Sequence, residues 1–561
     1  MDYKDSSEKH FFLMGIATVL GRSCDAVMRG GRLLNTQWKR GRASLKDLYP
    51  NARNVALCIL RQSSSTVTNM GMESYVNRTG NKTDVAVRPF HEIPGPKGLP
   101  IIGSLWEYTC LGKLDHRRFD EALWSRYQQY GKIYKENLGP RGTFVRIADP
   151  VDIETVYRNE GRYPHRPSFP LVRESMEAAG QELLKHRARS ESSFNGQGLE
   201  WYRTRSAVNR TLLRRSGVAL FHPTLNEISN DFLALLKRSL DENKTVPDLE
   251  WHIRRYNTEV AGTTIFGHRP GCLEPDFSES CQTSEMIKSI GEFFASWLKL
   301  DIGFPLTKYL MKDTWNGYMN AHRNILKIVK YHMDLDVEYE DDRPSVLGYL
   351  LSESSLSDTD AAMSAVELFV GGVQSSSHAD MFQLYELARH PHVQETIRRE
   401  VAEAVPKGEA VTSAHLQKLP YLKAFVKETF RFHPVGLLHM RILDRDVVLS
   451  GYRVPAHTTI EIPMSVLGRL EELYPQADRF LPERWLRRGP NGFRSRMFSQ
   501  VTPFGHGPRA CIGRRLAEDK FYMQISKLVQ NFDLHCDEEV DTLTGCFQEL
   551  SPKPNIRFTP R

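Results

Sequence analysis

Residues 504–513 read Phe-Gly-His-Gly-Pro-Arg-Ala-Cys-Ile-Gly, and a helical pattern follows them directly. Backbone N–H groups at the start of such a helix would stabilise a thiolate at Cys511 and lower the pKa of the thiol. Gly507 and Gly513 let the backbone turn sharply and pass close beneath a flat ligand, and Arg509 can present paired donors to a carboxylate. Because a thiolate can bind iron, the stretch indicates a cofactor site. A structural cysteine in a glycine-rich loop is the alternative.

Two more patterns pair side chains on predicted helices. Glu428 and Arg431 are three residues apart on a helix expected over about residues 416–432, and Trp201 and Arg205 are four apart further upstream. Side chains at these spacings share one helix face, so the members of each pair can act together. Alone, either pair is equally typical of an ordinary amphipathic helix. Their order along the chain, ahead of Cys511, is what makes them informative.

The order of these elements resembles the cytochrome P-450 family, the haem-thiolate monooxygenases. The resemblance covers residues 88–561 and includes Phe-Leu-Pro-Glu-Arg-Trp at residues 480–485. It implies one large haem domain, expected at residues 85–561, which is mainly α-helical with small β-sheets. Recurrent helical periodicity and short strand patterns, at residues 446–452 and 458–463, agree with that fold.

The resemblance also assigns the haem contacts. Cys511 would be the axial ligand of haem b, with Phe504 and Gly513 in the same motif. Four side chains would contact the haem propionates: Trp201, Arg205, Arg441 and Arg509. Three residues would form a buried network that braces the haem loop and would be structural rather than catalytic: Glu428, Arg431 and Arg484.

A long apolar helix is expected over residues 358–389, with Val-Gly-Gly-Val-Gln-Ser-Ser-Ser at residues 370–377. In the resembling family this helix crosses the distal face of the haem, and Gly371 and Gly372 would make room for O2. Gln374 stands where the family has an acid, and Ser375 where it has threonine. Serine keeps a hydroxyl that can donate a proton, whereas glutamine cannot ionise. A slower or less coupled oxygenase is the favoured consequence; an O2-independent rearranging enzyme and a proton relay through another group are the alternatives.

Positive charge is concentrated at the N-terminal end. The chain carries a net charge of +7, and residues 1–84 hold thirteen Lys or Arg against seven Asp or Glu, which leaves +1 for the rest. The nearly neutral body gives no argument for binding nucleic acid. A basic, Ser-rich and acid-poor segment predicts a mitochondrial transit peptide and flexible N-terminal segment at residues 1–84. The apolar run at residues 11–20 is too short to span a bilayer, so peripheral contact with the matrix side of the inner membrane is expected.

Basic side chains near the motif predict a redox partner. Lys423 and Lys427 lie one helical turn apart, and mitochondrial-type members of the family use lysines at these positions to dock an acidic, adrenodoxin-like [2Fe–2S] ferredoxin, which an NADPH-dependent reductase reduces. Arg514 and Arg515 fit the same basic surface. Opposite charge steers an acidic carrier to such a face. A solvated helix face is the alternative.

The substrate class also follows from the resemblance. Residues 88–94, 130–134 and 387–391 look like animal mitochondrial steroid and sterol hydroxylases, and residues 433–438 are similar to the segment that lines their substrate pocket. The sequence therefore predicts a monooxygenase that hydroxylates a large apolar substrate, a steroid or sterol. Three alternatives stay open: the rearranging enzyme, a non-catalytic haem protein, and a reticulum enzyme served by a flavoprotein reductase.

Overall fold

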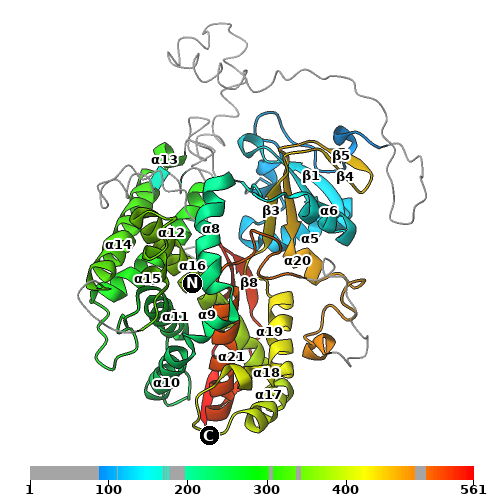
Figure 1. Ribbon diagram of the computed structural model, residues 1–561. Coiled ribbons are helices and arrows are strands. Elements are labelled where there is room, and N and C mark those ends of the chain that lie inside the picture. The colour runs from blue at the N-terminus through cyan, green and yellow to red at the C-terminus, as the bar shows by residue number, and fades with distance from the viewer. Residues whose placement is uncertain are drawn as a thin grey trace, which may run out of the picture.

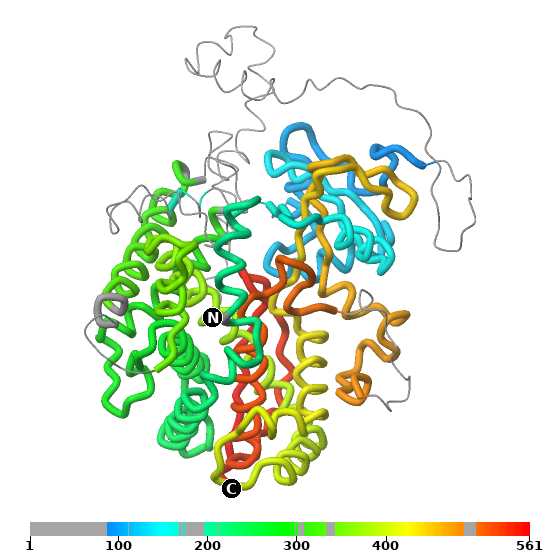
Figure 2. Tube along the Cα trace, viewed as in Figure 1, coloured from blue at the N-terminus to red at the C-terminus, as the bar shows by residue number. Residues whose placement is uncertain are grey.

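The computed structural model describes residues 87–109, 111–167, 171, 174–175, 196–301, 307–336, 343–486 and 501–561. A large helical part and a smaller strand-rich part lie side by side, and the strand-rich part is built from two segments far apart in the sequence, blue and gold in Figures 1 and 2. The predicted transit segment and most of residues 168–195 lie outside the described residues.

The described helices agree with a mainly α-helical fold. Their bounds are α5 Phe119–Tyr130, α6 Pro150–Asn159, α8 Gly198–Leu212, α9 Arg215–Ala219, α10 His222–Arg238, α11 Leu249–Phe266, α12 Gln282–Asp301, α13 Thr307–Leu310, α14 Lys312–Asp336, α15 Val346–Leu351, α16 Asp358–Arg389, α17 Pro391–Ala404, α18 Ser413–Gln417, α19 Pro420–Phe432, α20 Met464–Gly468 and α21 Arg514–Asn531. No helix among these described residues is long and apolar enough to cross a membrane.

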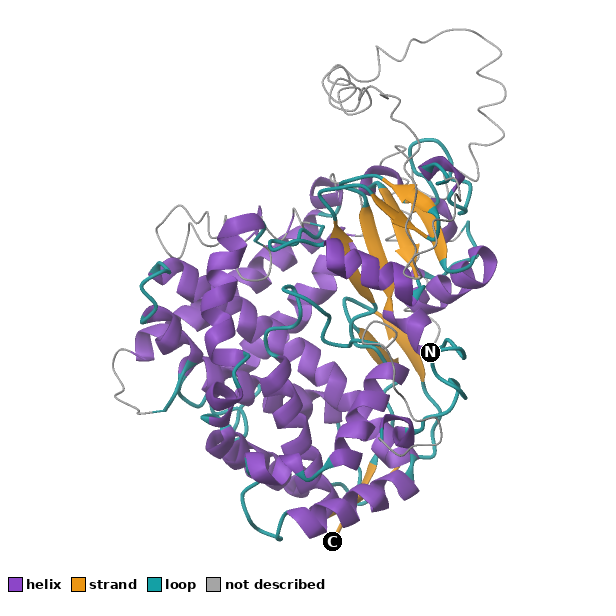
Figure 3. Ribbon diagram, turned by 45° about the vertical axis from the view of Figure 1, so that its right-hand side comes forward, coloured by secondary structure: helices purple, strands orange, loops and turns teal. Residues whose placement is uncertain are grey.

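The strands form one four-stranded sheet and three two-stranded ones. In the larger sheet the order is β1 Ile133–Asn137, β2 Thr143–Ile147, β6 Thr459–Pro463 and β3 Leu438–Ile442. The three strand pairs are β10 Arg557–Pro560 with β7 Phe532–His535, β4 Val447–Leu449 with β5 Tyr452–Val454, and β8 Asp541–Thr544 with β9 Gln548–Ser551. Figure 3 shows the four-stranded sheet at one end of the molecule, beside the helices. Only β2 and β6 run parallel within it.

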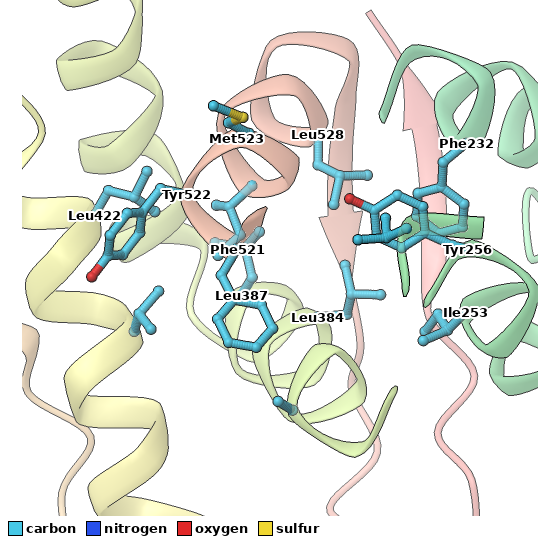
Figure 4. Close-up of a cluster of buried hydrophobic side chains, with 14 of the residues drawn as sticks. Phe232, Ile253, Tyr256, Leu384, Leu387, Leu422, Phe521, Tyr522, Met523 and Leu528 are labelled. Carbon is cyan, nitrogen blue, oxygen red and sulfur yellow. The ribbon is translucent and has the colours of Figure 1, made fainter. Parts of the chain in front are cut away.

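The helical core lies where α10, α11, α16, α19 and α21 meet. Its largest side chains are fully buried, and Figure 4 shows Phe232 and Tyr256 stacked in it, with ring centroids 4.4 Å apart. Leu384 of α16 and Leu528 of α21 fill the centre of the same cluster. Burial of this apolar surface fixes α16 and α21 relative to each other. These two helices carry the two halves of the predicted site.

The structure confirms the long helix and corrects two shorter elements. The Ser357 hydroxyl caps α16 by accepting from the Asp360 N–H, and the helix ends before Pro391, at the predicted bounds. The helix expected over residues 416–432 is wrong in its first part, because Pro420 breaks it into α18 and α19. The strand expected at residues 446–452 is a tight hairpin turning at Ser450 and Gly451.

Candidate active site

The loop at residues 504–513 is closed on itself just before α21. The Cys511 N–H donates to the Phe504 carbonyl at 2.6 Å, and the Ala510 N–H donates to the Gly507 carbonyl at 3.0 Å. Gly507 has a positive φ of 75°, and a Cβ at that position would run into the carboxylate of Glu160. Glycine is therefore required for the loop to lie this close to its neighbours. The Phe504 ring packs edge-on against Phe430, with centroids 5.3 Å apart.

The Cys511 side chain is exposed, yet enough protein atoms surround it for burial to be the main influence on its pKa. Burial raises the pKa of the thiol, while the Gly513 N–H and the charges of Arg205 and Arg514 act in the opposite direction. The predicted lowering of this pKa is therefore wrong for the polypeptide alone, since α21 begins three residues later and burial outweighs the helix start.

The four residues predicted to contact haem propionates converge on this loop. Arg205 of α8 donates to the Ala510 carbonyl, and Arg441 of β3 donates to the His506 carbonyl at 2.9 Å and pairs with Glu160. Arg509 donates to the Pro164 carbonyl at 2.9 Å. The fully buried Trp201 ring lies beneath the Arg509 guanidinium, 3.8 Å from its central carbon. The sequence could not predict these partners, because they come from segments far apart in the chain.

Several buried arginines lie close together around this loop, which is typical of a binding site for an anionic ligand. Burial first, and neighbouring arginines second, lower the pKa of Arg509 to about 8 and that of Arg166 to about 10. Burial also lowers the pKa of Arg205 to about 10. The Nη1 of Arg509 is buried without a hydrogen-bond partner among the described residues. Buried cations that repel one another, with a donor unused, are stabilised by bound carboxylates. Arg166 was missed, because no motif surrounds it.

Two glycines of α16 leave open space beside this helix. A Cβ added at Gly371 meets no described heavy atom within 4 Å, and at Gly372 the nearest is the Ala261 Cβ at 4.0 Å. The Ser375 hydroxyl donates to the Gly371 carbonyl at 2.7 Å, so its hydrogen bond is made within α16 itself. The charge of Glu367, one turn before Gly371, opposes the lowering of the Arg166 pKa. This interaction links α16 electrostatically to the arginine cluster formed by Arg166, Arg205, Arg441 and Arg509.

These features fit a haem group. An exposed thiol can bind iron, buried cations suit two propionates, and Gly371 and Gly372 of α16 leave the open space that a flat ring needs. Gly513 agrees, since a Cβ there also meets no described atom within 4 Å.

Glu428, Arg431 and Arg484 lie together in one buried network. The Glu428 carboxylate is completely buried and accepts from Arg431 at 2.8 and 2.9 Å and from Arg484 at 3.0 Å. The Leu481 N–H and the Trp485 indole N–H, each at 2.8 Å, complete its hydrogen bonds. The two guanidinium groups also donate to backbone carbonyls, so this buried cluster is well satisfied.

The basic side chains lie at the start of α21 and on α19. Lys427 and Arg514 are exposed, and Lys423 is half-buried with its Nζ 6.0 Å from the Tyr522 ring centroid. Burial lowers the pKa of Lys423; the charge of Asp519 acts against this shift, and the charge of Arg215, at the start of α9, acts with it. Arg215 is exposed and joins this basic face, which sequence spacing had not indicated. Arg515 is half-buried beside Arg514.

A model of the cytochrome P450 family matches residues 93–558. The chain therefore belongs to this family, whose members bind haem iron through a cysteine thiolate and act as monooxygenases. Cytochrome P450 10 of Lymnaea stagnalis is 31% identical over 520 residues, 90% of this chain and 91% of the relative. Mitochondrial sterol 26-hydroxylase of Rattus norvegicus is 30% identical over 85% of this chain and 90% of its own. Mitochondrial cholesterol side-chain cleavage enzyme of Oncorhynchus mykiss is 28% identical over 84% and 90%.

Proposed function

We propose that this cytochrome P450 hydroxylates a large apolar substrate, a sterol or steroid, with O2 and with electrons from an adrenodoxin-like [2Fe–2S] ferredoxin. The observation that carries the proposal is the exposed Cys511 thiol with the buried side chains of Arg205 and Arg509 close to its loop. The relatedness to mitochondrial sterol hydroxylases supports the substrate class. By the same argument residues 1–84 are a mitochondrial transit peptide, residues 85–561 are the haem domain, and the enzyme works at the matrix side of the inner membrane.

Cys511 is the residue that holds the haem iron in this proposal. Haem supplies the activation of O2 when it is bound, and the thiolate donates electron density that favours cleavage of the O–O bond. Arg205, Arg441 and Arg509 would hold the carboxylates of the group by charge-assisted hydrogen bonds. Ser375 supplies a hydroxyl that can hold or pass a proton on the opposite side.

The basic face on α19 and α21 supports the ferredoxin. Lys423 and Lys427 lie on α19 and Arg515 lies at the start of α21, directly after the cysteine loop, and Arg215 extends this basic face. An acidic protein is drawn to such a face, and the attraction weakens with salt. A carrier docked here would lie near the thiolate side of the site rather than the α16 side.

Reversing these charges should impair electron delivery by ferredoxin without affecting haem binding. Lys423→Glu with Lys427→Glu should raise the KM for ferredoxin at least ~10-fold, since like charges then face each other, and leave the spectrum of the dithionite-reduced carbon monoxide complex unchanged. Because Lys423 is half-buried, Lys427→Glu alone serves as a second variant. The control reverses exposed Lys312 and Lys327 on α14, which lies on the other side of the helical part in Figure 1. An unchanged KM in both α19 variants contradicts the docking site.

One observation favours a second function. Gln374 cannot ionise, and its Oε1 is buried without a partner among the described residues. An enzyme that rearranges a peroxide needs no proton from this position, so the chain would fit that reaction as well. Turnover of a fatty-acid hydroperoxide without NADPH or ferredoxin would establish it, and strict dependence on both electron donors would exclude it.

A further inference from the structure

The side chain next to Gln374 along α16 is a buried histidine. Gln374 Nε2 and His378 Nε2 are 3.0 Å apart, one helical turn from each other, and both side chains are buried. Ser375 and His378 are three residues apart, so they share a helix face. The position with no ionisable group therefore has an ionisable neighbour directly beside it. The hydrogen bond holds the imidazole in one orientation.

Four charged side chains act on His378, whose ring packs against Phe547, two residues before Glu549, with ring centroids 5.9 Å apart. Burial is the main cause that lowers the pKa of His378, to about 4, so the ring is neutral at pH 7. The charges of Glu549 and Glu250 act against this shift, while those of Arg254 and Lys553 act with it.

These four charged groups form one cluster. Lys553 lies 2.9 Å from Glu250 and 3.0 Å from Glu549, and Arg254 lies 2.8 Å from Glu250. The side chains of Lys553 and Glu549 are 43% and 36% exposed, so protons from solvent can reach this end.

We propose that His378 takes the place of the missing acid by passing protons from the Glu250–Glu549–Lys553 cluster to Ser375, while Gln374 holds its ring in position. The proposal rests on the O2-dependent function proposed above. His378 acts through Ser375 and is therefore a relay residue, and Gln374 is a positioning residue.

The transfer is balanced without any oxidant or reductant. Because the Gln374 amide donates to it, Nε2 of neutral His378 is the acceptor nitrogen and Nδ1 carries the proton. An incoming proton binds at Nε2 in place of the Gln374 hydrogen bond while the Nδ1 proton leaves, so the ring ends neutral in its other tautomer. A bridging water passes the proton to the Ser375 oxygen, and the serine releases its own hydroxyl proton towards the haem side. The unpartnered Oε1 of Gln374 is an acceptor that can hold such a water.

The test compares His378→Gln with His252→Gln in the holoenzyme. Glutamine can keep a hydrogen bond to Gln374 but cannot carry a proton. His252 is a partly buried histidine of α11 whose Nδ1 lies 3.3 Å from Arg255 Nη1. The measured quantity is O2 consumption in H2O and in D2O, with cholesterol as the probe and electrons from ferredoxin or from a photoreduced dye. We expect His378→Gln to slow consumption at least ~10-fold and to increase the solvent isotope effect, as loss of a general acid does. His252→Gln should change neither.

A rescue variant and a titration separate a relay from a structural role. Gln374→Glu added to His378→Gln restores an ionisable group one residue before Ser375, and should recover most of the rate. In the ferrous carbon monoxide holoenzyme, the carbon resonance of labelled His378 should titrate below the usual range, and Gln374→Ala should shift that titration. A rate lost without a change in isotope effect and without rescue overturns the relay, as does an unchanged rate.

Failure of the proposed function gives a different result. If the wild-type holoenzyme consumes no O2 with either electron donor, the O2-dependent function is wrong, and the relay falls with it. If it consumes O2 with the dye alone, only the ferredoxin assignment is wrong, and the His378 comparison still decides the relay. A titration of His378 that Gln374→Ala does not alter overturns the role given to Gln374.

Discussion

Replacing Cys511 with serine should abolish the thiolate spectrum of the protein. The long-wavelength Soret band of the reduced carbon monoxide complex requires a thiolate opposite the gas, and a hydroxyl cannot supply one at neutral pH. Any haem that remains should absorb at shorter wavelength, and hydroxylase activity should disappear. The measurement is the difference spectrum together with haem content per chain.

A second cysteine provides the matched control. Cys281 is half-buried just before α12, and Cys281→Ser should leave both spectrum and haem content unchanged. Retention of the thiolate band in Cys511→Ser would show that another residue binds the iron, and the site assignment would then be wrong.

Replacing Glu428 with glutamine should prevent stable haem incorporation. The substitution leaves Arg431 and Arg484 buried with their positive charges uncompensated, and the penalty for breaking a buried pair in this way is about 3–5 kcal/mol. Loss of the carboxylate also weakens hydrogen bonds from Leu481 and Trp485. Haem content after expression and the midpoint of urea unfolding measure the effect.

Glu395 on α17 offers the same substitution at an exposed ion pair. Its side chain is 47% exposed and lies 3.8 Å from Arg399; it also pairs with Arg398, which keeps a second carboxylate partner in Asp533. Surface pairs contribute ~1 kcal/mol or less, so Glu395→Gln should keep full haem content and nearly the same unfolding midpoint. Equal behaviour of the two variants would mean that the buried network does not brace the haem loop.

Local signals predicted the helices best. The bounds of α16 follow from a serine cap and a proline just past its end, and both are visible in the sequence. The break before α19 was equally visible at Pro420, but helical periodicity on both sides was given more weight than the proline. Burial decided the Cys511 pKa, and no sequence pattern reports how many protein atoms surround a side chain.

Contacts between distant segments of the chain could not be predicted from the sequence. The spacing of Glu428 and Arg431 gave their pair, whereas the Arg441–Glu160 and Arg509–Pro164 contacts join distant segments that no local pattern connects. His378 illustrates the same limit. In sequence it is one histidine in an apolar helix, and only folding places it beside the charged cluster around Lys553.

The most direct test of the central claim, a haem held by a thiolate, is the carbon monoxide difference spectrum of the dithionite-reduced wild-type protein. The account predicts the long-wavelength Soret band of a thiolate-ligated haem, at about one haem per chain. A band only at the shorter wavelength of a histidine-ligated haem, or no haem bound at all, would contradict it.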